Sequence, residues 1–177
     1  MMKAYLLLLS LISTVITISA CTSQSASESA AEPGQLSDLS ALESAALANL
    51  SMMINEQFSI YGTQVKFSAT GGEFREGLPP SDDNYSYQIA QVTPTKVYMT
   101  AIANQSNLRS LSAQIFVIPE ASRAQAYSNS PISGSICVTN TPSQSAPTEP
   151  ADATVAEPPC PSGSFSAGVF YPYGGNQ

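Results

Sequence analysis

The pattern of apolar and polar residues divides the chain into four parts. Residues 4–20 are almost all apolar or small, whereas residues 22–35 are rich in Ser, Ala and Glu and contain a Pro-Gly pair. From residue 39 to residue 61, apolar residues recur at steps of three and four, which is typical of a long amphipathic helix with one buried stripe. The stripe consists of Leu39, Leu42, Ala46, Leu50, Met53, Ile54, Phe58 and Tyr61.

The start of this helix is marked by the sequence Ser40-Ala41-Leu42-Glu43. It predicts a capping box, in which the Ser40 side chain caps the helix and the Glu43 side chain reaches back to the Ser40 backbone. Gly62 is a candidate break or bend, and Gly71-Gly72 is expected to end the segment. The polar face of the helix is predicted to carry Glu43, Asn49, Asn55 and Glu56.

From residue 84 onward the hydrophobic period changes to two, which indicates strands. Segments 84–93 and 95–103 predict an antiparallel hairpin that turns around Thr93-Pro94-Thr95. Further strands are expected at 111–118, at 133–139 and, as a short final strand, at 164–170. Residues 140–161 are rich in Thr, Pro, Ser, Ala and Glu and predict a loop. The expected class is α+β, with one long helix packed on a three- to five-stranded antiparallel sheet.

The apolar residues 4–20 follow Lys3 and end in small side chains, which is the layout of a secretory signal. The run is shorter than the roughly 20 apolar residues that cross a bilayer. Ile18, Ser19, Ala20 and Cys21 resemble the lipobox of a bacterial lipoprotein. The resemblance implies that Cys21 is joined to a diacylglycerol, that the chain is cut before it, and that the new amino group is acylated.

The alternative for this segment is ordinary cleavage that leaves Cys21 as a free thiol. That alternative places Ile18 where A-x-A-type cleavage sites prefer a small residue. Thr22, rather than Asp, follows the cysteine, which resembles the pattern of lipoproteins sorted to the outer membrane, so we expect the anchor in that membrane, on its periplasmic or surface face. We therefore expect a signal peptide at 1–20, a lipidated flexible tether at 21–37 and a globular domain at 38–177, exported and anchored to a membrane by its lipid.

Composition narrows the chemistry that the domain can perform. The chain has 13 acidic and 6 basic residues, a net charge of −7, and no histidine. The acidic balance argues against nucleic acid as a partner. Without histidine there is no Ser-His-Asp or Cys-His site and no imidazole ligand for zinc, so we expect no metal, no cofactor and no enzymatic activity. Asp82-Asp83 lies in a turn-like PPSDDN string and is expected to be solvated.

Two cysteines remain if Cys21 is acylated. In an exported chain, Cys137 and Cys160 predict one disulfide, which would stabilise the fold by roughly 3 kcal/mol on the chain-entropy model. A redox-active pair is the alternative, but the wide spacing lacks the motif that lowers a thiol pKa.

Several segments together resemble the type IV pilin-like G/H proteins of cyanobacteria over residues 45–165. The matching segments are 84–89, 97–101, 107–117, Ile136-Cys137 and 160–164. The resemblance implies a helix lying across an antiparallel sheet and a cysteine-bridged C-terminal region. The chain departs from it in two ways: Ser112 stands where that family has Gly, and a lipobox and polar tether stand where pilins carry an apolar half-helix. These features suggest a pilin-like head on a lipid anchor.

Two functions follow from this reasoning. The first is an interaction role at the cell surface or in the periplasm, with an envelope protein or pilus machinery as partner. Its contact candidates are the exposed sheet edge, the Cys137–Cys160 loop, Tyr171 and Tyr173, although each tyrosine could equally cap the core.

The second function is binding of a glycan or other small ligand by Tyr85, Tyr87 and Tyr98. Strand alternation sends Tyr85 and Tyr87 to the same face of the sheet. If the helix covers that face, these tyrosines belong to the core. If solvent covers it, they form a binding platform.

Overall fold

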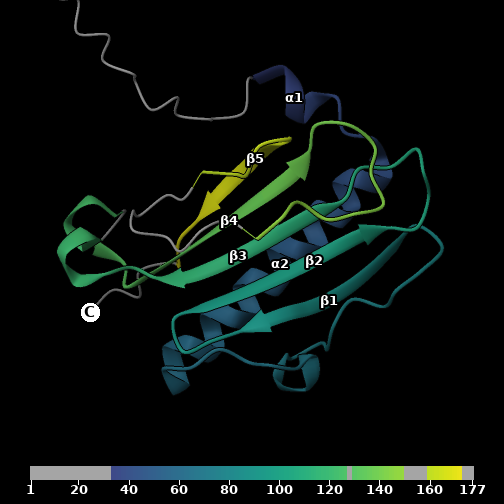
Figure 1. Ribbon diagram of the computed structural model, residues 1–177. Coiled ribbons are helices and arrows are strands. Elements are labelled where there is room, and N and C mark those ends of the chain that lie inside the picture. The colour runs from purple at the N-terminus through teal and green to yellow at the C-terminus, as the bar shows by residue number, and fades with distance from the viewer. Residues whose placement is uncertain (1–32, 127–128, 150–158, 173–177) are drawn as a thin grey trace, which may run out of the picture.

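The computed structural model describes residues 33–126, 129–149 and 159–172. It shows one long helix packed across a five-stranded antiparallel sheet (Figure 1), which confirms the predicted α+β class. Two short 3₁₀ helices, η1 (Gly71–Glu73) and η2 (Glu120–Gln125), lie in the connections. The other elements are α1 (Pro33–Ser37), α2 (Ala41–Gln64), β1 (Tyr85–Val92), β2 (Lys96–Ala103), β3 (Leu111–Val117), β4 (Ile132–Thr139) and β5 (Ser164–Phe170).

Every strand of the sheet pairs with its neighbour in the sequence, so the spatial order is β1-β2-β3-β4-β5. The predicted hairpin is confirmed: the Thr93 N–H donates to the Lys96 carbonyl at 2.7 Å and closes the turn between β1 and β2. The pairing of β1 with β2 shifts register between Ile89 and Gln91, and the pairing of β4 with β5 shifts between Ile136 and Cys137. All five strands lie where the period-two pattern predicted them.

Helix α2 packs on one face of the sheet, over β2, β3 and β4. The helix lies close to the sheet at Gly134, where an added Cβ would lie 3.2 Å from Ile54 Cγ2 and 3.3 Å from Phe58 Cζ. Leu42 was predicted in the buried stripe, but its side chain is 42% exposed because the first turn of α2 presents Glu43 inward instead. The core beneath α2 includes Ala46, Leu50, Met53, Ile54, Val97, Met99, Leu111, Ile115, Ile136 and Val138.

The C-terminal end of α2 differs from the prediction. The helix passes Gly62 without a break and ends at Gln64. Val65 then adopts the left-handed conformation with φ of 54°, and its N–H donates to the Tyr61 carbonyl at 2.8 Å. A β-branched residue rarely adopts this conformation, because its Cβ crowds the following carbonyl.

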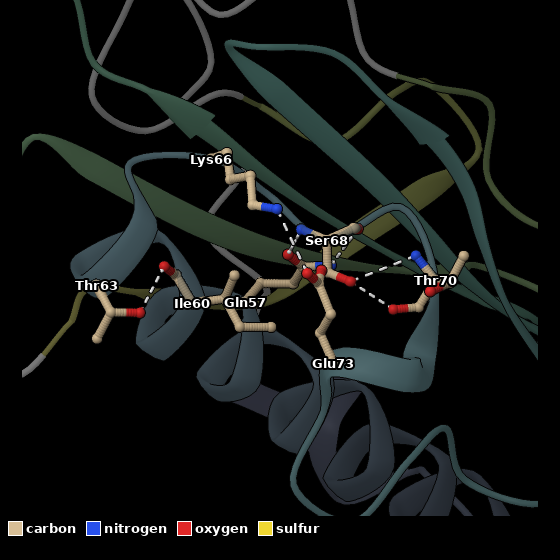
Figure 2. Close-up of polar contacts among 7 residues, drawn as sticks. All are labelled: Gln57, Ile60, Thr63, Lys66, Ser68, Thr70 and Glu73. Carbon is tan, nitrogen blue, oxygen red and sulfur yellow. Dashed lines mark hydrogen bonds and ion pairs between the residues drawn. The ribbon is translucent and has the colours of Figure 1, made fainter.

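A buried amide ties the next segment back to the helix (Figure 2). The Gln57 side chain is fully buried, and it both accepts from the Ser68 N–H at 2.9 Å and donates to the Ser68 carbonyl at 3.0 Å. It therefore pairs with Ser68 as a neighbouring strand would. At the surface, Lys66 Nζ lies 3.4 Å from Glu73 Oε1, which closes the same turn from outside.

Candidate functional site

Residues 140–149, which we call the strap, cross the sheet on the side away from α2 (Figure 1). The sequence predicted these residues only as part of a loop. The contacts reach from Lys96 at the start of β2 to Leu108 in the β2–β3 connection, so the strap lies along this strand. They are a hydrogen bond from the Ser143 N–H to the Leu108 carbonyl (2.9 Å), one from the Tyr98 hydroxyl to the Pro147 carbonyl, and an ion pair between Lys96 Nζ and Glu149 Oε1 (2.5 Å).

The Cys137–Cys160 disulfide fixes the return of the chain to the sheet. Cys137 lies on β4 and is 2% exposed, and the two Cα atoms are 5.6 Å apart. Strand alternation places Cys137 on the strap side, because Ile136 and Val138 belong to the core under α2. The predicted disulfide is confirmed. Its buried position in a strand agrees with a structural role.

The strands beneath and beside the strap carry an unusual set of buried polar side chains, which we call the polar layer. A solvent-inaccessible oxygen or nitrogen in each of them has no hydrogen-bond partner among the described residues, and each residue is 8% exposed or less. Strand pairing brings them together, since Gln114 of β3 lies opposite Ser135 of β4. The members are Thr100, Gln114, Ser133, Ser135 and Thr139.

At the other side of the sheet, the N-terminal end of α2 is held by Glu43. The predicted capping box is confirmed: the Glu43 N–H donates to Ser40 Oγ at 3.2 Å, and the Ser40 N–H donates to Glu43 Oε2 at 2.7 Å. Glu43 Oε1 also accepts from the Arg109 N–H at 2.9 Å. Glu43 was predicted on the polar face, which is wrong: it is 4% exposed because the β2–β3 connection packs over it.

The environment of Glu43 acts on its pKa in two directions. Burial raises the pKa, but the hydrogen bonds from the backbone of Ser40 and Arg109, with help from the Ser40 hydroxyl and the Arg109 charge, outweigh it. The pKa of Glu43 therefore lies below its ordinary value of 4.5. Glu43 is an ionised group that joins the helix end to the β2–β3 connection.

The tyrosines of the predicted binding platform lie in the interior. Tyr85 is 2% exposed and its hydroxyl donates to the Arg109 carbonyl at 2.9 Å. The Tyr87 hydroxyl, half-buried against the same core, accepts from the Asn49 amide at 2.9 Å. The helix covers both rings, so the core alternative is confirmed and the platform formed by Tyr85 and Tyr87 is wrong. Tyr98 points to the opposite face, beneath the strap, and burial raises the pKa of its hydroxyl.

The C-terminal part of the described chain covers a smaller second core. Tyr171 is partly buried and packs against this cluster of Phe116, Ile118 and Ala126, as the core-capping alternative predicted. Tyr173 lies outside the described residues. Nearby, the surface forms a shallow groove of about 400 Å³, lined by Asn55, Phe58, Ser59, Gly62, Thr63 and Pro172.

The residues of the predicted anchor, Ile18, Ser19, Ala20 and Cys21, also lie outside the described residues, so lipidation stays a prediction. Within the predicted tether, residues 33–37 form the short helix α1. No helix in the described ranges combines the length and the hydropathy that a membrane span requires. Among the same residues, no group of three His, Cys, Asp or Glu side chains is placed to hold a metal ion.

Comparison with known proteins identifies the family to which this fold belongs. No curated protein and no solved structure matches the chain. The family model for type IV pilin-like G and H proteins matches residues 43–161, about two thirds of the sequence. The matched range starts at the buried Glu43 and ends just after Cys160, so it contains nearly all of α2, strands β1 to β4, the strap and the disulfide. The chain belongs to the type IV pilin-like G and H family.

Proposed function

We propose that the protein is a non-enzymatic, lipid-anchored envelope protein that presents its pilin-like head to a component of type IV pilus-like machinery. The observation that carries this proposal is the family match over residues 43–161, which supports a structural role related to type IV pili. The match coincides with the part of the chain that folds into the helix, the sheet and the strap.

The start of α2 supports an anchor other than a continuous apolar helix. Ser40 has extended backbone angles, with φ of −64° and ψ of 164°, and its capping box ends the helix on the N-terminal side. The resemblance to pilins implies a contrast, because in pilins an apolar half-helix forms the core of the filament. Here the apolar residues 4–20 are separated from α2 by a polar segment and by this cap. Acyl chains on Cys21 would attach the protein to the membrane, with a binding free energy of about 0.8 kcal/mol per buried CH₂.

The edges of the sheet are the contact surface that this arrangement leaves open. Strands β1 and β5 end the sheet, and each pairs on one side only. Gln88, Ala90 and Gln91 of β1 are exposed, as is Val169 of β5. An open strand edge can pair with an extended segment of another protein, so these edges suit a structural partner.

The anchor is tested by mass spectrometry of the mature amino terminus together with partitioning between detergent and water. We expect an acylated Cys21 and recovery of the protein in the detergent phase. The matched control is Cys21→Ala, which should remain uncleaved at this site or move to the aqueous phase. A mature chain that carries an unmodified Cys21 and stays in the aqueous phase would overturn the anchor.

The partner is tested by chemical cross-linking in intact cell envelopes, followed by purification of the tagged, full-length protein. Pilus components recovered with the wild-type protein, and lost when Gln88 and Ala90 on the exposed β1 edge are both changed to Lys, would support the proposal. Lysine side chains on an edge strand oppose pairing with another chain. Recovery of envelope proteins unrelated to pili would overturn this part of the proposal and leave the anchor intact.

A further inference from the structure

The polar layer is destabilising, because its buried polar atoms have no hydrogen-bond partner among the described residues. A buried hydroxyl or amide without a hydrogen-bond partner destabilises the state in which it is buried, so native proteins contain few of them. Here five lie together on one face of one sheet, and they come from β2, β3 and β4. A set of this size in one place suggests a surface whose hydrogen bonds are made to another molecule.

The strap covers the β2 side of this face, and its hydrogen bonds and ion pair go to residues outside the polar layer. The Ser143 carbonyl accepts from the Ser110 hydroxyl at 2.5 Å, and the Gln144 amide donates to the Asn104 carbonyl at 3.0 Å. Further strap contacts go to Leu108, Tyr98, Lys96 and Gly163. Among the described residues, the strap therefore lies over the β2 side of the polar layer, and the buried polar atoms of the polar layer have no hydrogen-bond partner.

The chemistry of the covered face points to a neutral ligand. The polar layer supplies four hydroxyl groups and one carboxamide, and none of its members is charged. Tyr98 lies beside it, because Tyr98 of β2 is the register partner of Gln114 of β3. An aromatic ring next to hydroxyl and amide groups matches a compound with apolar ring faces and many hydroxyl groups, that is, a carbohydrate.

We propose that Tyr98 and the polar layer form a binding surface for a neutral carbohydrate, and that the strap is a cover which the ligand displaces. The Cys137–Cys160 disulfide stays intact and keeps the chain attached to β4 when the strap lifts. The closed state predominates without ligand, and the ligand shifts the population toward the open state by the hydrogen bonds that it adds there. This inference does not rest on the lipid anchor.

The sign of a change in melting temperature tests whether the polar layer is unpaired. In the full-length protein in detergent, Thr100→Val should raise Tm by about 2–4 °C, because it removes a desolvated hydroxyl and keeps the shape. Ser110→Ala is the matched control. Ser110 is equally buried, but its hydroxyl accepts from the Ala103 N–H at 2.9 Å and donates to Ser143, so this substitution should lower Tm. An unchanged or lower Tm for Thr100→Val overturns the inference.

Binding is measured on an array of neutral β-glucan, chitin and xylan oligomers, again with the full-length protein. Wild type should retain at least one of these oligomers, and Thr100→Val should retain it at least tenfold more weakly. Glu149→Gln, which removes the ion pair that holds the strap to Lys96, should retain it more strongly. Glu73→Gln removes the distant ion pair with Lys66 and should behave like wild type.

Each other outcome counts against the proposal. If neither wild type nor Glu149→Gln retains an oligomer, the carbohydrate assignment is wrong. If Thr100→Val binds as well as wild type, the ligand does not use the polar layer. If Glu149→Gln binds no better than Glu73→Gln, the strap does not act as a cover. Circular dichroism of each variant shows whether the fold is kept.

Discussion

Removal of the buried charge at the start of α2 is the perturbation with the most specific expected result. Glu43→Gln keeps the shape of the side chain, but its amide has one acceptor oxygen where the carboxylate has two. Glu43 accepts from two backbone N–H groups, those of Ser40 and Arg109. In the variant, one of these donors must face the NH₂ group of the amide and lose its partner.

The size of the effect follows from these two contacts. A hydrogen bond to a charged group contributes about 1.5–3 kcal/mol, and a neutral one contributes about 1 kcal/mol. Losing one charged bond and weakening the other should therefore lower the free energy of unfolding by about 3 kcal/mol. The Arg109 guanidinium adds little to this, because its Nη1 lies 3.9 Å from Glu43 Oε2.

The assay is urea denaturation of both proteins followed by circular dichroism, at pH 7 and at decreasing pH. The pKa of Glu43 is lowered in the folded state, so its stabilising effect is fully present above about pH 4.5, the value for an ordinary Glu. The effect is lost as pH falls through the folded-state pKa. The difference in unfolding free energy between wild type and Glu43→Gln should therefore shrink on acidification below pH 4.5.

Other carboxylates do not disturb this comparison. The pKa values of Asp82 and Glu73 are also lowered, but both groups titrate in wild type and variant alike. Glu120→Gln, at an exposed position, serves as the control and should leave stability unchanged at every pH. A difference for Glu43→Gln that stays constant or grows as the pH falls would refute the assignment of Glu43 as the ionised group.

The remaining predictions use the same denaturation assay. Val65→Gly should stabilise the protein by about 1 kcal/mol, because glycine adopts φ of 54° without strain; a loss of stability would contradict the left-handed cap. Gly134→Ala should destabilise by about 2 kcal/mol, because the new Cβ would lie 3.2 Å from a side chain of α2, whereas Gly62→Ala meets nothing within 4 Å and should be tolerated. Changing Cys137 and Cys160 together to Ser should cost about 3 kcal/mol, and an unchanged midpoint would show that the disulfide does not constrain the unfolded chain.

The fold was predictable where local patterns and tertiary packing agree. The strands follow the period-two pattern because one face of each contributes to the core that includes α2, and the hairpin at Thr93 follows from turn residues between two such segments. The capping box of Ser40 and Glu43 was also predictable, because it depends on residues three positions apart. The even pair Cys137 and Cys160, together with the secretory signal predicted at 1–20, was enough to propose their bond.

The candidate site was harder to predict, because it depends on contacts between distant segments. Periodicity assigned Glu43 to the polar face and Leu42 to the core, but Arg109, 66 positions away, draws the carboxylate inward. The buried polar residues of β3 and β4 were not singled out from the sequence. Nothing in the Thr/Pro-rich composition of the strap shows where it lies.

The neighbour-to-neighbour order of the sheet has a consequence for how the molecule assembles. A chain that emerges amino end first can add one hairpin after another, without waiting for a distant segment to complete an earlier pair. Helix α2 is the exception, because its apolar side is buried only after β3 and β4 have been synthesised and have paired. Until these strands are in place, α2 exposes an apolar stripe, and exposed apolar surface favours aggregation.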